Sequence, residues 1–219
     1  ILANALYGAI SNAGFRYYDL RIAEAVTLTG QASDRHVEMT LNQYMNKIMK
    51  TDDVDYVTYG DTDSVYLNLD PLVKVAFPDK SIDDTVKFLD KVCGTKLQDQ
   101  INASIESIYA TGNCYERIMD MKREVIASKA IWTAKKRYAM MVHNSEGIDY
   151  KPYKLKIMGM DLIKSSTPSL VRKRLKEALV VIFEKDQTSL YDFVTQFRNE
   201  FDTAPIEEIS FPRSVNGMT

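Results

Sequence analysis

The sequence predicts an α+β fold, with helices packed on an antiparallel sheet. A long stretch of helical apolar spacing follows Asp19, a suitable N-cap, and extends to about Lys50. Two short β-rich runs then flank residues 60–63, whose Gly and Asp content is typical of a hairpin turn. A second hairpin turn is expected at residues 144–147. The resulting order of helix, hairpin, helix, strands and helices indicates the α+β class.

The remaining elements are predicted from apolar spacing and from residues that favour helix starts. In chain order they are a helix end over 1–12, a helix over 83–109, strands over 138–142 and 148–157, a helix starting at Thr167-Pro168 and a last helix over 189–201. Nothing before Ile1 could cap the first helix, so we expect the chain to be truncated there. Ser189 with Asp192 resembles a capping box. The positions expected to be buried are Ile22, Ala23, Val26, Val37, Leu41, Tyr44, Ile48, Val86, Leu89, Val92, Leu97, Leu170, Leu175, Leu179, Ile182 and Phe183.

Composition and charge describe an ordinary globular chain with one unusual segment. The 219 residues are 45% hydrophobic and 26% charged. They show no signal peptide and no apolar run long enough to span a bilayer. Cys93 and Cys114 lack CxxC spacing, so we expect no zinc site or disulfide framework, and a reducing compartment fits. The net charge is −2, yet residues 122–176 hold fourteen Lys or Arg against four Asp or Glu. Such a span can form a polyanion-binding face or a solvated surface with chance clustering.

The first hairpin turn carries residues with the chemistry of a metal site. Alternate residues of an extended segment can point to the same side, so the carboxylates of Asp61 and Asp63 can converge. Without a counter-ion they would repel each other, and a divalent cation between them removes that cost. Ligands that are all oxygen favour Mg²⁺ or Mn²⁺ over zinc. From these residues alone, an ordinary turn rich in Gly and Asp, which is the commoner case, stays open.

Four motifs occur in order along the chain: Asn4-Ala5-Leu6-Tyr7-Gly8, Tyr59-Gly60-Asp61-Thr62-Asp63-Ser64, Lys135-Lys136-Arg137-Tyr138, and Lys154-Leu155-Lys156-Ile157-Met158-Gly159 followed by Lys164-Ser165-Ser166-Thr167-Pro168. In that order they resemble the fingers-helix motif, the palm signature, the basic motif and the entry to the thumb of family B DNA polymerases, and among them those of T-even-type bacteriophages. Ala5 departs from the Ser that is more usual in the family. Each motif alone is weak or moderate support; their order makes the resemblance specific.

The resemblance implies a role for the acidic turn. Asp63 would be a principal ligand of two Mg²⁺ ions, with Mn²⁺ as a possible substitute, and Asp61 would be a secondary or occasional ligand. The palm aspartate that bridges both ions would lie before Ile1, as would the fingers lysine that grips the incoming triphosphate. The turn would therefore be half of a catalytic site.

The fingers-helix motif implies a nucleotide-binding surface. Asn4 would face the nucleotide pocket, Tyr7 would lie under the nascent base pair, and Gly8 would allow close approach of the backbone. Without the resemblance, Asn4 and Tyr7 are three apart on a helix and could be plain packing or surface residues.

The basic motif implies contact with DNA through Lys135, Lys136, Arg137 and Tyr138, together with Thr62 of the acidic turn. These four residues are expected to begin a strand, so that Lys136 and Tyr138 share the face toward the primer terminus. Cations there can contact minor-groove acceptors or phosphates without reading sequence, as copying any template requires. A solvated basic turn is the alternative.

Three further residues are weaker candidates. Glu124 resembles a family glutamate close to the metal site, although a surface strand residue is equally consistent. Arg172 and Arg174 could follow duplex phosphates from the thumb helix, although exposed helix faces are commonly this charged. Trp132 is expected to pack rather than to stack on bases.

The chain is therefore interpreted as the end of the fingers helix and a connector (1–18), the C-terminal part of the palm (19–160) and the start of a mostly helical thumb (161–219). The implied reaction is template-directed transfer of a nucleotide from a dNTP to a primer 3′-hydroxyl by a two-metal mechanism. The isolated chain is expected to be inactive. The expected partners are primer-template DNA, dNTP and, through a segment absent here, a sliding clamp; no membrane is involved, and the host cytoplasm is the expected location. The alternatives are another two-metal enzyme such as a cyclase, a DxD glycosyltransferase, or a degenerate DNA-binding remnant.

Overall fold

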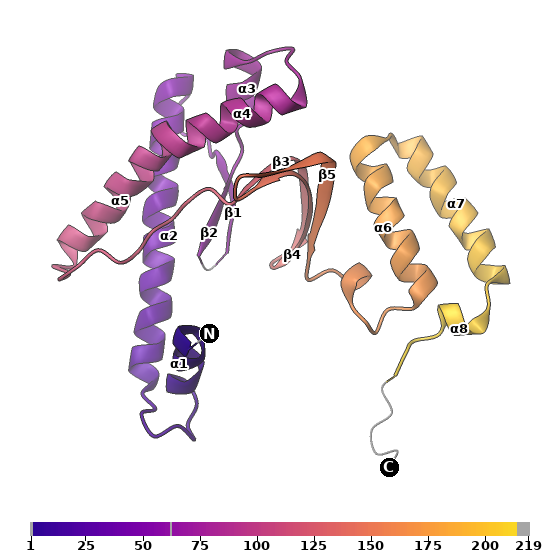
Figure 1. Cartoon of the computed structure of the whole chain (residues 1–219), viewed down its shortest axis with the longest axis horizontal. Coiled ribbons are helices and arrows are strands. Elements are labelled where there is room, and N and C mark those ends of the chain that lie inside the picture. The colour runs from indigo at the N-terminus through magenta and orange to yellow at the C-terminus, as the bar shows by residue number, and fades with distance from the viewer. Residues whose placement is uncertain (1, 62, 214–219) are drawn as a thin grey trace. The chain divides into compact units, whose positions relative to one another are not determined.

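The computed structural model describes residues 2–61 and 63–213 and confirms the α+β class (Figure 1). The helices are α1 (Leu2–Ile10), α2 (Leu20–Met49), α3 (Asp70–Ala76), α4 (Ile82–Val92), the π-helical turn η1 (Cys93–Leu97), α5 (Gln98–Thr111), the 3-10 turn η2 (Asp161–Ile163), α6 (Ser169–Glu184), α7 (Gln187–Thr203) and α8 (Ile206–Ile209). The strands are β1 (Val57–Asp61), β2 (Ser64–Leu67), β3 (Val125–Ala134), β4 (Arg137–Ser145) and β5 (Ile148–Met158). Both sheets are antiparallel, with orders β1-β2 and β3-β4-β5. The chain divides into two compact units, one ending at Arg123 and the other beginning at Glu124.

Helix α2 has the boundaries that the sequence predicts. The side chain of Asp19 caps it by accepting a hydrogen bond from the Arg21 amide, at 2.9 Å. The Arg21 guanidinium also hydrogen-bonds this carboxylate and holds the pKa of Asp19 at about 2. At the other end, Lys50 adopts the left-handed conformation typical of helix C-termini, and its N–H donates to the carbonyl of Asn46.

The core of the first unit forms between α2, α5 and the two-stranded hairpin. Val37, Leu41 and Met45 of α2 are buried against Leu97 and Ile105, and Figure 1 shows α5 crossing α2. This packing removes apolar surface from water, which is the main favourable term in folding.

The predicted buried face of α2 is right in part. Ala23, Val37 and Leu41 are buried as expected, whereas Ile22, Val26 and Ile48 are exposed. These three predictions are wrong: Ile22, Val26 and Ile48 lie toward the two ends of α2, outside the stretch from Val37 to Met45 that packs in the core. Tyr44 lies at the edge of the core.

The predicted helix over 83–109 consists of α4 and α5 joined by a π-helical turn. Residues 93–97 adopt i→i+5 hydrogen bonding between two α-helical stretches. Val86 and Leu97 are buried as predicted. The short helix α3, which has a proline in its first turn, has no counterpart among the predicted elements.

In the second unit, β3, β4 and β5 form a meander. The β4–β5 connection is the two-residue turn Glu146-Gly147, whose φ angles of 51° and 85° are both positive. Such turns match the right-handed twist of the flanking strands, and this hairpin confirms the prediction. Ala139 and Met141 of β4 pack with Leu179 and Phe183 of α6 in the core of this unit.

The two long helices of this unit begin close to where they are predicted. Pro168 is the N-cap of α6, in which Leu170 is buried and Ile182, contrary to prediction, is exposed. Helix α7 is capped by Asp186, whose carboxylate accepts a hydrogen bond from the Ser189 amide at 2.9 Å. The predicted capping box is therefore wrong, since Ser189 is the third helical residue and not the cap.

No helix in the described part of the chain is long and apolar enough to cross a membrane.

Candidate active site

The acidic turn lies at the tip of the β1–β2 hairpin. Asp61 is the last residue of β1 and pairs with Ser64, so the turn is shorter than the four residues expected. The carbonyl of Asp61 accepts hydrogen bonds from the Asp63 amide (2.6 Å) and the Ser64 hydroxyl (3.2 Å). Asp61 is half-buried and Asp63 is exposed. Thr62, which was expected to contact DNA, lies outside the described residues.

Two aromatic side chains pack across this hairpin, two residue pairs before the Asp61–Ser64 pair at its tip. Tyr59 and Tyr66 face each other across the two strands, with ring centroids 5.4 Å apart and an interplanar angle of 56°. Cross-strand aromatic pairs of this kind stabilise a two-stranded ladder that would otherwise be marginal.

A third carboxylate faces the hairpin from α2. The pKa of Asp34 is raised from 3.8 to about 6 because burial disfavours its charged form, and the charges of Asp63, Asp61 and Glu38 raise it further. The contributions of Asp63 and Asp61 indicate that the Asp34 carboxyl lies close to the hairpin tip. Asp34 was not among the sequence-based candidates.

The arrangement fits part of a divalent-cation site. The tip offers the carboxylates of Asp61 and Asp63 close to that of Asp34, and oxygen ligands of this kind suit a hard cation. Within residues 2–61 and 63–213, however, no three His, Cys, Asp or Glu side chains gather closely enough to hold a metal ion. The described residues thus supply an incomplete ligand set.

The fingers-helix motif lies on α1. Tyr7 is exposed, and a Cβ added to Gly8 would meet no atom of the described residues within 4 Å. Packing within that part of the chain therefore does not require a glycine at position 8. The side chain of Asn4 lies outside the described part of the structure.

The basic motif forms the turn between β3 and β4. Ala134 pairs with Arg137, which leaves Lys135 and Lys136 as the two turn residues, and Lys136 has a positive φ of 62°. Gly159 fits beneath this turn, because a Cβ there would lie 2.1 Å from the carbonyl oxygen of Lys136. The thumb-entry motif thus supports the basic motif through one glycine, which only the fold reveals.

This turn corrects the expectation that the basic motif begins a strand. Since Lys135 and Lys136 precede β4, strand alternation does not put Lys136 and Tyr138 on one face. Both lysines and Arg137 are exposed, whereas Tyr138 is buried and its ring lies 6.4 Å from that of Trp132. The partial burial of Trp132 agrees with its expected packing role.

Comparison with known proteins gives the family. Residues 1–211 match the profile of "DNA polymerase family B". The chain is 35% identical over 228 aligned positions to the "DNA-directed DNA polymerase" of Enterobacteria phage T4, an alignment that covers 100% of this chain and 25% of that protein. It is 41% identical over 189 positions to the protein of the same description from Escherichia phage RB69, covering 82% of this chain and 21% of that protein. The chain belongs to DNA polymerase family B.

The chain spans about a quarter of the length of these curated relatives. Its family membership argues against the cyclase and glycosyltransferase alternatives. It also accounts for the four motifs together, since the profile covers all of them.

Among the weaker candidates for DNA contact in this family B chain, Arg174 is already paired with side chains of the chain itself. Its guanidinium forms ion pairs with Glu177 and Glu200, both at 2.6 Å, which raises the pKa of the group. Arg174 therefore ties α6 to α7. Arg172 is half-buried, and its guanidinium reaches the carbonyl of Lys164 at 3.5 Å. Glu124 is exposed, and its carbonyl accepts a hydrogen bond from the Glu146 amide at 2.7 Å.

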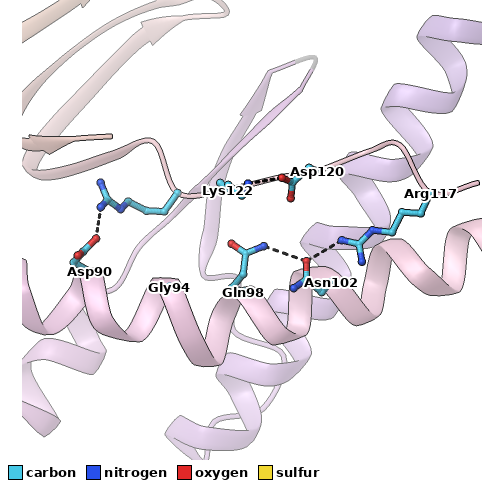
Figure 2. Close-up of a pocket in the computed structure, with 8 residues that line it drawn as sticks. Asp90, Gly94, Gln98, Asn102, Arg117, Asp120 and Lys122 are labelled. Carbon is cyan, nitrogen blue, oxygen red and sulfur yellow. Dashed lines mark hydrogen bonds and ion pairs between the residues drawn. The ribbon is translucent and has the colours of Figure 1, made fainter. Parts of the chain in front are cut away.

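A polar pocket lies in the first unit between the α4–η1–α5 helix and the extended segment 117–123 (Figure 2). Its volume is about 500 Å³. Gln98 donates to the carbonyl of Met121 at 2.8 Å, and Arg117 donates to Asn102 at 2.9 Å. The Tyr109 hydroxyl accepts hydrogen bonds from the amides of the segment at residues 118 and 119.

The charged groups of this pocket are paired within the fold. Arg123 binds Asp90, and Lys122 binds Asp120 at 2.6 Å (Figure 2). The hydrogen bonds and ion pairs around the pocket thus hold in place the segment that leads to Glu124. The sequence around Gln98 and Tyr109 does not mark them as residues that hold this segment, because their partners are backbone groups outside their own helix.

Proposed function

We propose that this chain is the segment of a DNA-directed DNA polymerase that comprises the end of the fingers helix (1–18), the C-terminal palm (19–160) and the start of the thumb (161–219). The longer enzyme adds a deoxynucleotide to a primer in a template-directed reaction. The primer 3′-hydroxyl oxygen forms a bond to the α-phosphorus of the dNTP, the bond to pyrophosphate breaks, and the hydroxyl loses its proton.

The observation that carries this proposal is the acidic hairpin tip inside a family B chain. Asp61 is the last residue of β1 and Asp63 lies in the turn that follows it; their charges, after burial, contribute to the raised pKa of the nearby Asp34. In the proposed site Asp63 is a principal metal ligand and Asp61 an occasional one. Two bound Mg²⁺ ions, or Mn²⁺, would activate the primer hydroxyl and neutralise charge on the leaving pyrophosphate.

The other motif residues have positioning roles in this proposal. Asn4, Tyr7 and Gly8 contribute to the nucleotide-binding surface. The exposed turn of Lys135 and Lys136, with Arg137 and with Thr62 of the acidic turn, contacts the DNA backbone. Such contacts hold the duplex without reading its sequence.

Three further residues complete the proposed assignments. Tyr138 supports the basic turn from within the sheet, since it is buried. Glu124 contributes near the metal site, and Arg172 lies on the DNA side of the thumb. Contact with a sliding clamp, through a segment outside this sequence, and action in the host cytoplasm complete the proposal.

The test is the Asp63→Asn variant of the full-length polymerase that carries this segment. The variant should lose primer extension by at least about a thousandfold, since it removes a charged ligand that acts in the transition state. Its affinity for primer-template duplex should change little. Extension is measured with a labelled primer, and duplex binding by fluorescence anisotropy.

The matched control is Asp52→Asn, which removes an exposed carboxylate from the same unit. It should extend primers like the parent enzyme. Extension by Asp63→Asn at the parent's rate would refute the site assignment.

The isolated chain of 219 residues should not extend primers at any Mg²⁺ concentration, because its described residues supply an incomplete ligand set. Template-dependent incorporation by the purified chain would contradict this.

A further inference from the structure

The segment that leads into β1 is held by side chains of α2. The amide oxygen of Asn42 accepts hydrogen bonds from the backbone N–H groups of Tyr56 (2.8 Å) and Val57 (3.0 Å). The amide nitrogen of the same side chain donates to the Asp55 carboxylate at 2.7 Å. One side chain thus engages three consecutive residues at the start of the strand.

Asn46, one helical turn further along α2, repeats this arrangement. Its amide donates to the carbonyl of Val54 (2.7 Å) and accepts from the amide of Val54 (3.0 Å), the two bonds that a neighbouring β-strand would make. Its oxygen also accepts from the Thr51 hydroxyl at 2.7 Å, and that hydroxyl lies 2.9 Å from the Tyr56 hydroxyl. Since residues four apart share a face of a helix, the two asparagines act together.

These contacts lie at the start of β1. Within the described residues this sheet has two strands; β2 pairs with β1 from Val57 onward, and the Asn68 amide donates to the Tyr56 carbonyl at 2.7 Å. Tyr56 and Val57 are almost fully buried, so amides left without acceptors there would carry the full cost of desolvation. Asn42 supplies an acceptor for both of them, and the Asp55 carboxylate is a second acceptor for the Val57 amide, at 3.1 Å.

The strand transmits this anchoring to the acidic tip. Val57 and Asp61 are the first and last residues of β1, and both pair with β2, with a register shift between Val57 and Tyr59. Pairing at both ends of the strand couples their positions. A shift of Val57 relative to α2 would therefore move Asp61, and with it Asp63, relative to the rest of the unit.

We propose that Asn42, supported by Asn46, is a positioning residue that holds the carboxylates of Asp61 and Asp63 in their catalytic geometry. This inference rests on the proposed function of the acidic tip. Asn42 itself does not touch substrate, since both groups of its amide are engaged with residues 55–57.

The chemistry of the contact makes an asparagine necessary. The site requires an acceptor for two N–H groups and a donor for the Asp55 carboxylate at the same time. Aspartate at position 42 would keep the acceptor, lose the donor and place a second negative charge against Asp55. Exchanging both residues, as Asn42→Asp with Asp55→Asn, restores one donor and one carboxylate.

The experiment compares these variants in the full-length polymerase that carries this segment. Asn42→Ala and Asn42→Asp should each lower kcat about tenfold to a hundredfold, the range expected when reacting groups shift by about 1 Å. The KM for dNTP and the Kd for duplex should stay within about twofold. The exchanged pair should recover most of kcat, and Gln43→Ala, an exposed neighbour on α2, should match the parent.

Hydrogen exchange supplies a readout that does not depend on catalysis. The amides of Tyr56 and Val57 should exchange faster in Asn42→Ala and return to the parental rate in the exchanged pair. If Asn42→Ala fails to fold, the exchanged pair decides the question: a folded protein with recovered kcat supports the proposal, and a folded protein with low kcat overturns it. A parental kcat in folded Asn42→Ala also overturns it.

Failure of this inference is distinguishable from failure of the proposed function. If Asp63→Asn abolishes extension while Asn42→Ala leaves kcat unchanged, only the positioning role is wrong. If Asp63→Asn extends primers normally, the tip is not catalytic, and the effect of Asn42→Ala on kcat no longer bears on metal-ligand geometry.

Discussion

At the scale of single residues, Asp34 is a charge on an otherwise apolar face. It lies three, seven and eleven positions before Val37, Leu41 and Met45, the residues of α2 that form the core. Helical spacing puts all four on one side of the helix. The apolar environment and the like charges of the hairpin together raise its pKa to about 6.

This shift predicts how Asp34 affects stability. Its pKa is higher in the folded state than its ordinary value of 3.8, so the folded state binds more protons between these values. The stability that Asp34 contributes is therefore present below about pH 4 and is lost as the pH rises through 6. Asp34→Asn removes the ionisable group and with it this loss. The variant should raise the free energy of unfolding of the metal-free chain at pH 7.5 by about 1 kcal/mol or less, a figure already discounted for solvent screening.

The measurement is urea unfolding in EDTA at pH 7.5 and pH 4. The gain should be present at pH 7.5 and absent at pH 4. An equal effect at both values would show that charge on Asp34 is not its cause.

At the scale of elements, the N-termini of α2, α4 and α7 are each capped by one side chain. Helix α7 begins where the carboxylate of Asp186 accepts the Ser189 amide. Hydrogen bonding from the Ser189 side chain, and after it from the Ser189 amide, lowers the pKa of Asp186. Asp192, the other half of the expected capping box, is exposed in the second turn of the helix.

Loss of this cap should cost measurable stability. Asp186→Ala should lower the free energy of unfolding by about 1 kcal/mol, because one amide of the first turn loses its acceptor. Asp192→Ala serves as the matched control and should change it by less than about 0.5 kcal/mol. Chemical denaturation of both variants measures the difference, and a larger loss in Asp192→Ala would restore the capping-box interpretation.

At the scale of the whole molecule, charge is divided between the two units. Residues 1–123 carry a net −5 and residues 124–219 a net +3. The acidic tip belongs to the first unit and the exposed turn of Lys135 and Lys136 to the second. This division suits a protein that holds a cation with one unit and a polyanion with the other.

Duplex binding should therefore depend on salt through the second unit. In the full-length polymerase, Lys135→Ala should reduce the slope of log affinity against log salt by about 1, since one phosphate contact is lost. Lys80→Ala, an exposed lysine of the first unit, should leave the slope unchanged. Titrations at several salt concentrations give both slopes, and equal slopes for Lys135→Ala and the parent would exclude the proposed contact.

Much of the fold follows from local sequence. The N-cap of α2 at Asp19, the end of that helix near Lys50, the hairpin turn within residues 144–147 and the start of α6 at Pro168 are all predicted and all observed. Each depends on interactions between residues close together in the chain, such as a capping carboxylate or a backbone that must adopt positive φ. These preferences can be recognised from residue type and spacing alone.

The acidic turn, the basic motif and family membership could likewise be inferred from residue types in order. What the tertiary structure alone decided is which residues support them. Asp34, Asn42, Gln98 and Gly159 act on partners that are backbone groups or charges far away along the chain. Local periodicity holds no information about such partners, because burial and hydrogen bonding across elements arise only once the elements pack.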